Sequence, residues 1–162
     1  MRKWICILVL ALLLSGCAGQ ETFETVSDEM ISPVSAEARQ LTVELPQEAA
    51  TPTVESENGS LYICDGYEIG IQTLIAGDLD ATVRSISGYS AEELTLIRTT
   101  VGDMDRYDFV WACAGEGGDR IGRAAVLDDG DYHYVLTVIC NAEDAPTHEE
   151  AWQRMFQSFR AA

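Results

Sequence analysis

Lysine is almost absent from this chain of 162 residues: Lys3 is the only one, and the other cationic residues are arginines. The formal net charge is −17, so the protein is strongly acidic. An acidic surface repels phosphate backbones and anionic lipid surfaces, which argues against nucleic-acid binding. We therefore expect no nucleic-acid partner, and a basic or envelope protein is the partner whose charge fits best.

Motifs for catalysis and cofactor binding are lacking as well. There is no C-x-x-C pair and no dinucleotide-binding glycine pattern, and His133 and His148 are the only histidines. His133 is separated from Cys140 by an odd step of seven, so the two side chains fall on opposite faces of one strand. We expect no catalytic residue, no metal site and no cofactor. An enzyme that uses Cys140 and a histidine is the alternative.

The sequence has one long apolar run. It consists of the eleven residues Trp4–Leu14 and follows the positive pair Arg2 and Lys3. As a helix this run would span about 16 Å, roughly half of a bilayer core, so it is too short for a stable transmembrane segment. A short positive start followed by such a run has the proportions of an export signal.

The sequence Leu14-Ser15-Gly16-Cys17 at the end of this run resembles the lipobox of bacterial lipoproteins. The resemblance implies that residues 1–16 are removed and that Cys17 becomes the N-terminus and carries a diacylglycerol. Two or more acyl chains hold a protein firmly on a lipid bilayer. The resemblance therefore predicts a cell-membrane protein, lipid-anchored and facing outside the cytoplasm. The alternative is an ordinary secretory signal followed by a chance cysteine.

Residues 17–60 are polar and contain three of the four prolines, and their apolar residues are scattered. Segments that cannot bury enough apolar surface stay disordered, so we expect a disordered acidic linker behind the lipidated Cys17. Within it, Leu41–Leu45 alternates like a strand, and a short binding motif for a partner is the alternative there.

Residues 61–162 predict a single α+β domain with an antiparallel sheet of about five or six strands. Asp65-Gly66 marks a hairpin between the first two strands. Asp78 can cap a helix in the first half of the domain, and Gly88 can end it. A C-terminal helix carries one apolar stripe that we expect to pack on the sheet, formed by Trp152, Met155, Phe156 and Phe159.

The order of these elements is similar to that of the PsbP-like sandwich, a fold of extracytoplasmic lipoproteins. The likeness depends mainly on the strand Tyr132–Cys140 and the helix that follows it. It implies an accessory or binding role.

Three cysteines fall in the domain, Cys64, Cys113 and Cys140. The strands that carry Cys113 and Cys140 both flank residues 120–127, which puts these two cysteines about 10 Å apart. A disulfide needs Cα atoms within about 7 Å. The expected disulfide is therefore Cys64–Cys113, with Cys64–Cys140 second, and three free thiols are an equal alternative.

Candidate ligand contacts are few. Arg120 and Arg123 are the best candidates to bind an acidic ligand, and the face of Arg123 depends on whether the turn near residue 130 has two or three residues. The acids clustered at Asp128, Asp129 and Asp131 can bind calcium or form a turn. Five aromatics either line a cleft or fill the core, namely Tyr107, Phe109, Trp111, Tyr132 and Tyr134.

Together these observations predict a membrane-anchored extracytoplasmic lipoprotein that works as a non-enzymatic binding or accessory module. A thiol-dependent or hydrolytic enzyme is one alternative. A structural spacer without a ligand is the other.

The anchor predicts the behaviour of Cys17→Ser. This variant should lose labelling by a metabolic fatty-acid probe, because the thiol that accepts the lipid is gone, and should leave the membrane fraction. Labelling is read by gel fluorescence. Persistent labelling of the variant would show that the lipid is attached elsewhere.

Overall fold

The computed structural model describes residues 37–115 and 118–162. The expected signal sequence, Cys17 and the first part of the expected linker lie outside the described residues. No helix within the described part of the chain is long and apolar enough to cross a membrane.

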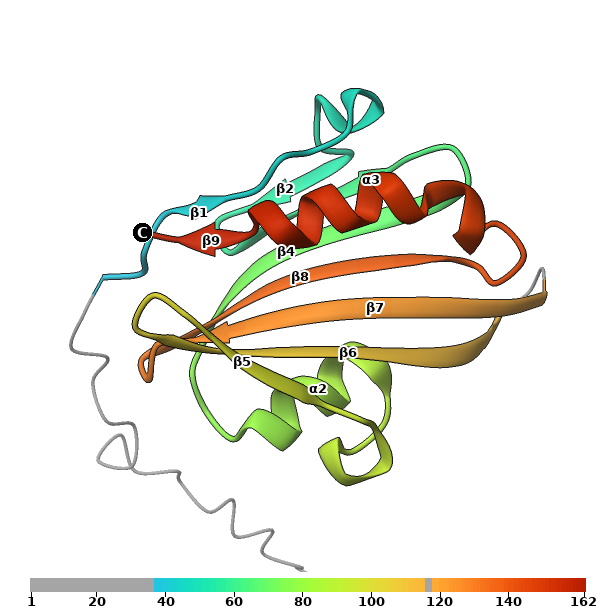
Figure 1. Cartoon of the computed structure of the whole chain (residues 1–162). Coiled ribbons are helices and arrows are strands. Elements are labelled where there is room, and N and C mark those ends of the chain that lie inside the picture. The colour runs from blue at the N-terminus through green and yellow to red at the C-terminus, as the bar shows by residue number, and fades with distance from the viewer. Residues whose placement is uncertain (1–36, 116–117) are drawn as a thin grey trace, which may run out of the picture. The chain divides into compact units, whose positions relative to one another are not determined.

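A seven-stranded antiparallel sheet forms the centre of the fold, with the strand order β2-β3-β4-β8-β7-β6-β5 (Figure 1). This confirms the expected α+β class, and the sheet has one strand more than the upper estimate. The strands are β2 (Val54–Ser56), β3 (Gly59–Ile63), β4 (Tyr67–Ile75), β5 (Ile97–Val101), β6 (Met104–Gly115), β7 (Gly118–Asp128) and β8 (Tyr132–Asn141). Two further short strands, β1 (Leu41–Thr42) and β9 (Arg160–Ala161), pair with each other.

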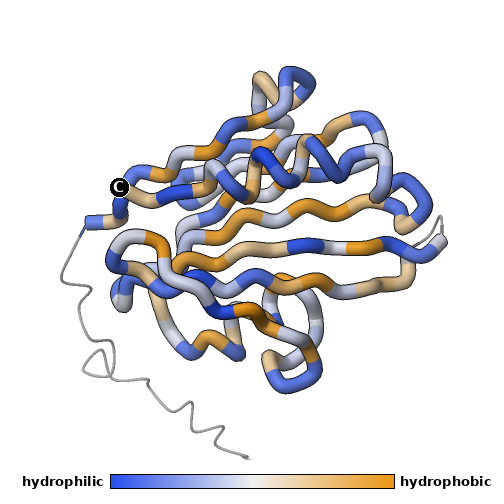
Figure 2. The backbone as a smooth tube through the Cα atoms, in the orientation of Figure 1, coloured by the Kyte–Doolittle hydropathy of each residue, from blue (hydrophilic) through white to orange (hydrophobic). Residues whose placement is uncertain are grey.

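Alternation along the strands gives the sheet two different apolar faces. On β8, Tyr134, Leu136 and Val138 belong to one buried cluster, whereas Val135 belongs to the other. On β6, Phe109 and Trp111 join Val135 on the second face. Successive side chains of a strand point to opposite sides, so one sheet supplies two cores. Figure 2 shows the long apolar stretch of β8 between its strand neighbours.

Helix α2 (Leu79–Ser87) covers one face, and its ends are as the sequence predicts. The Asp78 carboxylate accepts a hydrogen bond from the backbone N of Asp80 at 3.2 Å, and Gly88 adopts a left-handed φ of 81°. The helix buries Val83 against Phe109 and Trp111. The Trp111 ring lies directly on Gly122, where an added Cβ would come within 2.2 Å of the ring.

Helix α3 (Ala145–Ser158) covers part of the opposite face and lies along β4 and β8 in Figure 1. Its predicted stripe is confirmed, because Trp152, Met155 and Phe156 are buried and Phe159 follows them into the core. The sequence Thr147-His-Glu-Glu150 resembles a capping box and predicts a start at Thr147, but the observed start differs. The helix begins at Ala145 and takes Pro146 into its first turn, where a missing N–H costs nothing.

The expectation of a disordered linker up to residue 60 is wrong for residues 37–60. This segment contains β1, the short helix η2 (Gln47–Ala49) and β2. Its scattered apolar side chains pack at the margin of the α3-side core, and they are Leu41, Val43, Leu45 and Ala49. They need no core of their own, since the sheet and α3 already provide one. The Leu41–Leu45 alternation is therefore used inside the fold.

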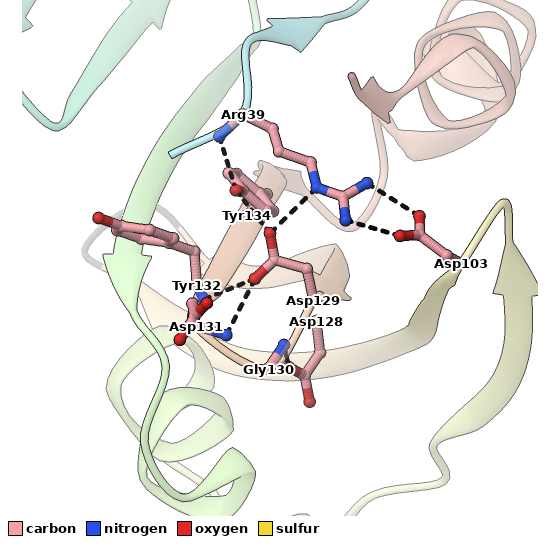
Figure 3. Close-up of polar contacts among 8 residues, drawn as sticks. All are labelled: Arg39, Asp103, Asp128, Asp129, Gly130, Asp131, Tyr132 and Tyr134. Carbon is pink, nitrogen blue, oxygen red and sulfur yellow. Dashed lines mark hydrogen bonds and ion pairs between the residues drawn. The ribbon is translucent and has the colours of Figure 1, made fainter. Parts of the chain in front are cut away.

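Arg39 fastens this N-terminal segment to two distant turns, as Figure 3 shows. Its guanidinium donates two hydrogen bonds to Asp103, at 2.8 and 2.7 Å, and its Nε lies 3.3 Å from Asp129. The Tyr134 hydroxyl donates to Asp129 at 2.8 Å and accepts the backbone N–H of Arg39 at 2.8 Å. The Arg39 guanidinium holds the pKa of Asp103 at about 2, below the ordinary 3.8. We call these four residues the N-terminal clamp.

The clamp predicts a dependence of stability on pH. Because the folded-state pKa of Asp103 is depressed, its contribution should be complete above about pH 4 and lost as the pH falls to about 2. The variant Asp103→Asn should therefore be less stable than the parent at pH 6, and this difference should be much smaller at pH 2, by urea unfolding. Glu57→Gln is the charge-matched control, since no ion pair holds Glu57 among the described residues. A gap between Asp103→Asn and the parent that is as large at pH 2 as at pH 6 would contradict the assignment.

Candidate functional site

A groove lies beside α3, where β5, β6 and β7 extend beyond the helix (Figure 1). Its volume is about 640 Å³. This lies within the range of about 300–1,000 Å³ that small-molecule sites occupy. The strands form the floor and α3 forms a wall, with lining residues Ile97, Thr99, Val101, Arg106, Asp108, Arg123, Glu149, Gln153, Phe156, Gln157 and Arg160.

The floor contains an ion pair between Arg106 and Asp108, and the two charges neutralise each other. Arg106 donates two hydrogen bonds to the Asp108 carboxylate, from Nε at 2.7 Å and from Nη2 at 2.9 Å. The Arg106 side chain is only 9% exposed, so this charge depends on its partner. The two residues stand two positions apart on β6 and therefore share a face of the sheet. Together they add almost no net charge to the groove.

Arg123 is the charged residue of the floor that has no ion-pair partner among the described residues. Its guanidinium carbon lies 4.1 Å from the centre of the Phe156 ring, in a cation–π arrangement. No hydrogen bond or ion pair joins it to another described residue. Burial lowers the pKa of Arg123, and Asp108 partly offsets this effect. An arginine stays protonated throughout the physiological range, so Arg123 presents a half-buried cation with unused donors.

The remaining lining is mixed in character. Gln153 and Gln157 place amides on the wall formed by α3, and Glu149 adds one carboxylate there. Ile97 and Val101 line the β5 side, and Ile97 is 61% exposed. Arg160 lies in β9, where its guanidinium donates to the backbone oxygen of Phe159 at 2.7 Å. This combination of amides, apolar side chains and cations can hold a small ligand and orient it.

The two predicted ligand contacts lie on opposite faces of the sheet. Arg123 pairs with Val138 and shares the α3 side with it, because the turn at Gly130 and Asp131 has two residues. Arg120 lies on the α2 side and forms an ion pair with Glu68 at 2.7 Å. The structure therefore does not bring the two arginines together, and of the two only Arg123 lines the groove.

The structure does not form the expected disulfide, because Cys64, Cys113 and Cys140 are all free thiols. Cys64 follows β3 and packs on the α3 side, whereas Cys113 is on β6 and packs on the α2 side. Four strand steps separate them, about 19 Å, which is far beyond bonding range. Cys64 and Cys140 share a face, but Tyr67 lies between them on β4.

A nucleophile made of Cys140 and a histidine is not assembled at β8. Cys140 is buried, its thiol donates to the backbone oxygen of Asn141 at 2.9 Å, and burial raises its pKa. His133 lies on the opposite face, as the odd spacing predicts, and its Nδ1 is 2.8 Å from the Thr82 hydroxyl. A protonated, buried thiol is inert compared with an exposed thiolate.

The other candidates also have structural roles. Asp128 and Asp129 accept backbone N–H groups of their own turn, and the described residues contain no group of acids, histidines and cysteines that could hold a metal. The five aromatics divide between the two faces: Phe109, Trp111 and Tyr107 lie on the α2 side, Tyr132 and Tyr134 on the α3 side. They do not line a common cleft.

Sequence reasoning missed Arg106, Asp108 and Arg160 as groove residues. One signal was present, because Arg106 and Asp108 stand at i and i+2 with opposite charges in a strand, the spacing that places both on one face. Arg160 gave no such signal, since its position follows from the pairing of β9 with β1.

Comparison with known proteins identifies the fold of this chain but assigns the chain to no family. No protein-family model matches the chain, and no curated protein matches it. Among solved structures, LpqN, involved in cell envelope biogenesis of Mycobacterium tuberculosis, is 11% identical with a TM-score of 0.50, over 75% of this chain and 83% of that chain. Cyanobacterial PsbP (CyanoP) from Synechocystis sp. PCC 6803 is 10% identical with a TM-score of 0.51, over 82% of this chain and 97% of that chain. The expected PsbP-like fold is confirmed.

The ion pair in the floor predicts different costs for two similar substitutions on β6. Asp108→Asn should lower the free energy of unfolding by about 2 kcal/mol, because it leaves the buried Arg106 without a countercharge. Asp105→Asn breaks the exposed pair with Arg98 and should cost at most about 1 kcal/mol. Urea unfolding of both variants at pH 7 measures the difference. Equal costs would mean that the floor pair contributes no more than a surface pair.

Proposed function

We propose that this protein is a lipid-anchored, extracytoplasmic binding module that takes a small ligand in the groove beside α3 and catalyses no reaction on it. The observation that carries the proposal is the groove itself. It is a hollow of about 640 Å³ that combines charged groups, amides and apolar side chains. Such hollows are where proteins of this size bind small molecules.

The location is proposed from Leu14-Ser15-Gly16-Cys17, with acylated Cys17 in the lipid bilayer of the cell membrane. The cell-envelope role of LpqN, a protein of the same fold, agrees with an extracytoplasmic site of action. The net charge of −17 suits a body that is held off an anionic membrane surface, and it also suits a basic or envelope protein as a further partner.

Two alternatives are less well supported. For an enzyme built on Cys140, the thiol is buried, donates to the backbone oxygen of Asn141 and faces away from His133. His148 packs against Tyr67 and Trp152, and no hydrogen bond joins it to Cys140 among the described residues. A spacer without a ligand needs no hollow and no half-buried cation without a hydrogen-bonding partner. Arg123 costs free energy in that role, since burial of a charge that nothing pairs is unfavourable.

The groove can be tested by filling it. The full chain is purified from membranes of the cells that make it, and native mass spectrometry detects any molecule that comes with it. Gln153→Trp places an indole in the groove from the wall formed by α3 and should abolish a co-purified ligand. Glu150→Trp adds the same ring on the exposed side of α3, where the Glu150 side chain is 82% exposed, and should keep the ligand.

Two results would contradict the proposal. One is a ligand that Gln153→Trp retains as fully as the parent does. The other is a chain that carries no small molecule in either form. The Cys17→Ser variant tests the anchor separately, so a failure of the groove leaves the anchor open to its own measurement.

A further inference from the structure

We infer that the ligand of the groove is a small monocarboxylate with an apolar body, and that Arg123 binds its carboxylate. This inference rests on the proposed function and names the chemical class of the ligand. It depends on three features of the groove: the geometry of Arg123, the count of unpaired charges on the floor, and the apolar side chains beside the guanidinium.

The geometry of Arg123 favours a planar anion. Its guanidinium carbon lies over the Phe156 ring, 4.1 Å from the ring centre, and Phe156 is itself 1% exposed. No described residue accepts a hydrogen bond from the N–H groups of Arg123. Two parallel N–H groups match the two oxygens of a carboxylate. Arg123 therefore lines the groove with its guanidinium held against Phe156 and its donors available to a carboxylate.

The charges of the residues that line the groove favour a ligand with a single negative charge. On the floor, Asp108 neutralises Arg106 with two hydrogen bonds, and Arg123 has no carboxylate partner among the described residues. Arg160 adds a further positive charge to the lining and Glu149 a further negative one, so the charged residues of the groove sum to +1. Glu149 on the wall repels further negative charge. A dianion such as a phosphate monoester would bring one charge more than the floor can compensate, and it would leave that charge in a partly buried place.

The surroundings of Arg123 favour an apolar body on the ligand. Val110 stands directly across from Arg123 in the β6–β7 pairing and is 56% exposed. Ile97 lies on the same face of the next strand and is 61% exposed. Sites that bind amphipathic molecules usually combine exposed apolar side chains with a charged group. Val110 lies outside the lining of the groove, so a ligand there would gain the hydrophobic part of its binding free energy from Ile97 and Val101.

The test uses three water-soluble probes with six carbons each: hexanoate, hexanamide and hexyl phosphate. The full chain, reconstituted in lipid nanodiscs, is labelled at the isoleucine methyl groups, and each probe is titrated by NMR. Ile97 reports on the groove. Ile63 is as exposed, at 60%, but lies on the opposite face, so it reports on non-specific effects.

Hexanoate should shift the Ile97 methyl signal and leave that of Ile63 in place. Hexanamide and hexyl phosphate should each bind about tenfold more weakly, or worse, because the first lacks the charge and the second carries too much. Arg123→Gln should weaken hexanoate by a similar factor, with Arg123→Lys between it and the parent, since lysine keeps the charge but loses the planar pair of donors. Arg154→Gln removes an exposed arginine from α3 and should change nothing.

Several outcomes would overturn the inference: equal binding of hexanamide, tighter binding of hexyl phosphate, no effect of Arg123→Gln, or no shift of Ile97 with any probe. Its failure can be told apart from that of the proposed function. A neutral or polyanionic ligand that Gln153→Trp displaces would leave the groove function standing and refute the carboxylate assignment. The unshifted Ile63 signal in each variant shows that the fold is intact.

Discussion

The width of the sheet controls the rest of this structure. An α-helix is about 10 Å across, whereas seven strands spaced about 4.8 Å apart make a sheet about 29 Å wide. On the side of α3, the helix covers β4 and β8, and the N-terminal segment closes the core next to β3 and β4 through Leu45 and Ala49. Among residues 37–115 and 118–162, no further helix lies over β5, β6 and β7 on this side. The groove is the uncovered part of a face that one helix is too narrow to cover.

The charges of the groove contrast with those of the chain. In a protein with a net charge of −17, three arginines line one hollow of about 640 Å³ with two carboxylates. A local positive potential inside an acidic surface attracts small anions into one place and repels them elsewhere. An acidic surface repels polyanions and anionic membranes at a distance, which agrees with the proposal that the groove takes a small anion.

How much could be predicted from the sequence depended on how local each feature is. Helix α2 was predicted end to end, because its cap at Asp78, its apolar face and its stop at Gly88 lie within eleven residues. The two faces of β6 and β8 also followed from alternation. By contrast, β2 is exposed along its whole length and therefore has no apolar pattern, and Arg39 meets Asp103 at a separation of 64 residues.

The strand order explains the remaining errors. A disulfide between Cys64 and Cys113 was reasonable only if their strands were neighbours, and β4, β8 and β7 lie between them. The face of Arg123 could not be decided until the turn at Gly130 and Asp131 was known to have two residues, because one residue more reverses the alternation. Local pattern thus predicted which elements form, and long-range pairing decided which side chains meet.

The N-terminal clamp has a mechanical consequence. A force that pulls on the chain from its N-terminal side reaches Arg39 before it reaches the β1–β9 pair at Leu41 and Thr42. Arg39 transmits the load to the turn that joins β5 to β6 and to the turn that joins β7 to β8, through Asp103 and Asp129. The load is therefore shared by the long central strands, and the two-residue pair behind it is shielded from being peeled apart bond by bond.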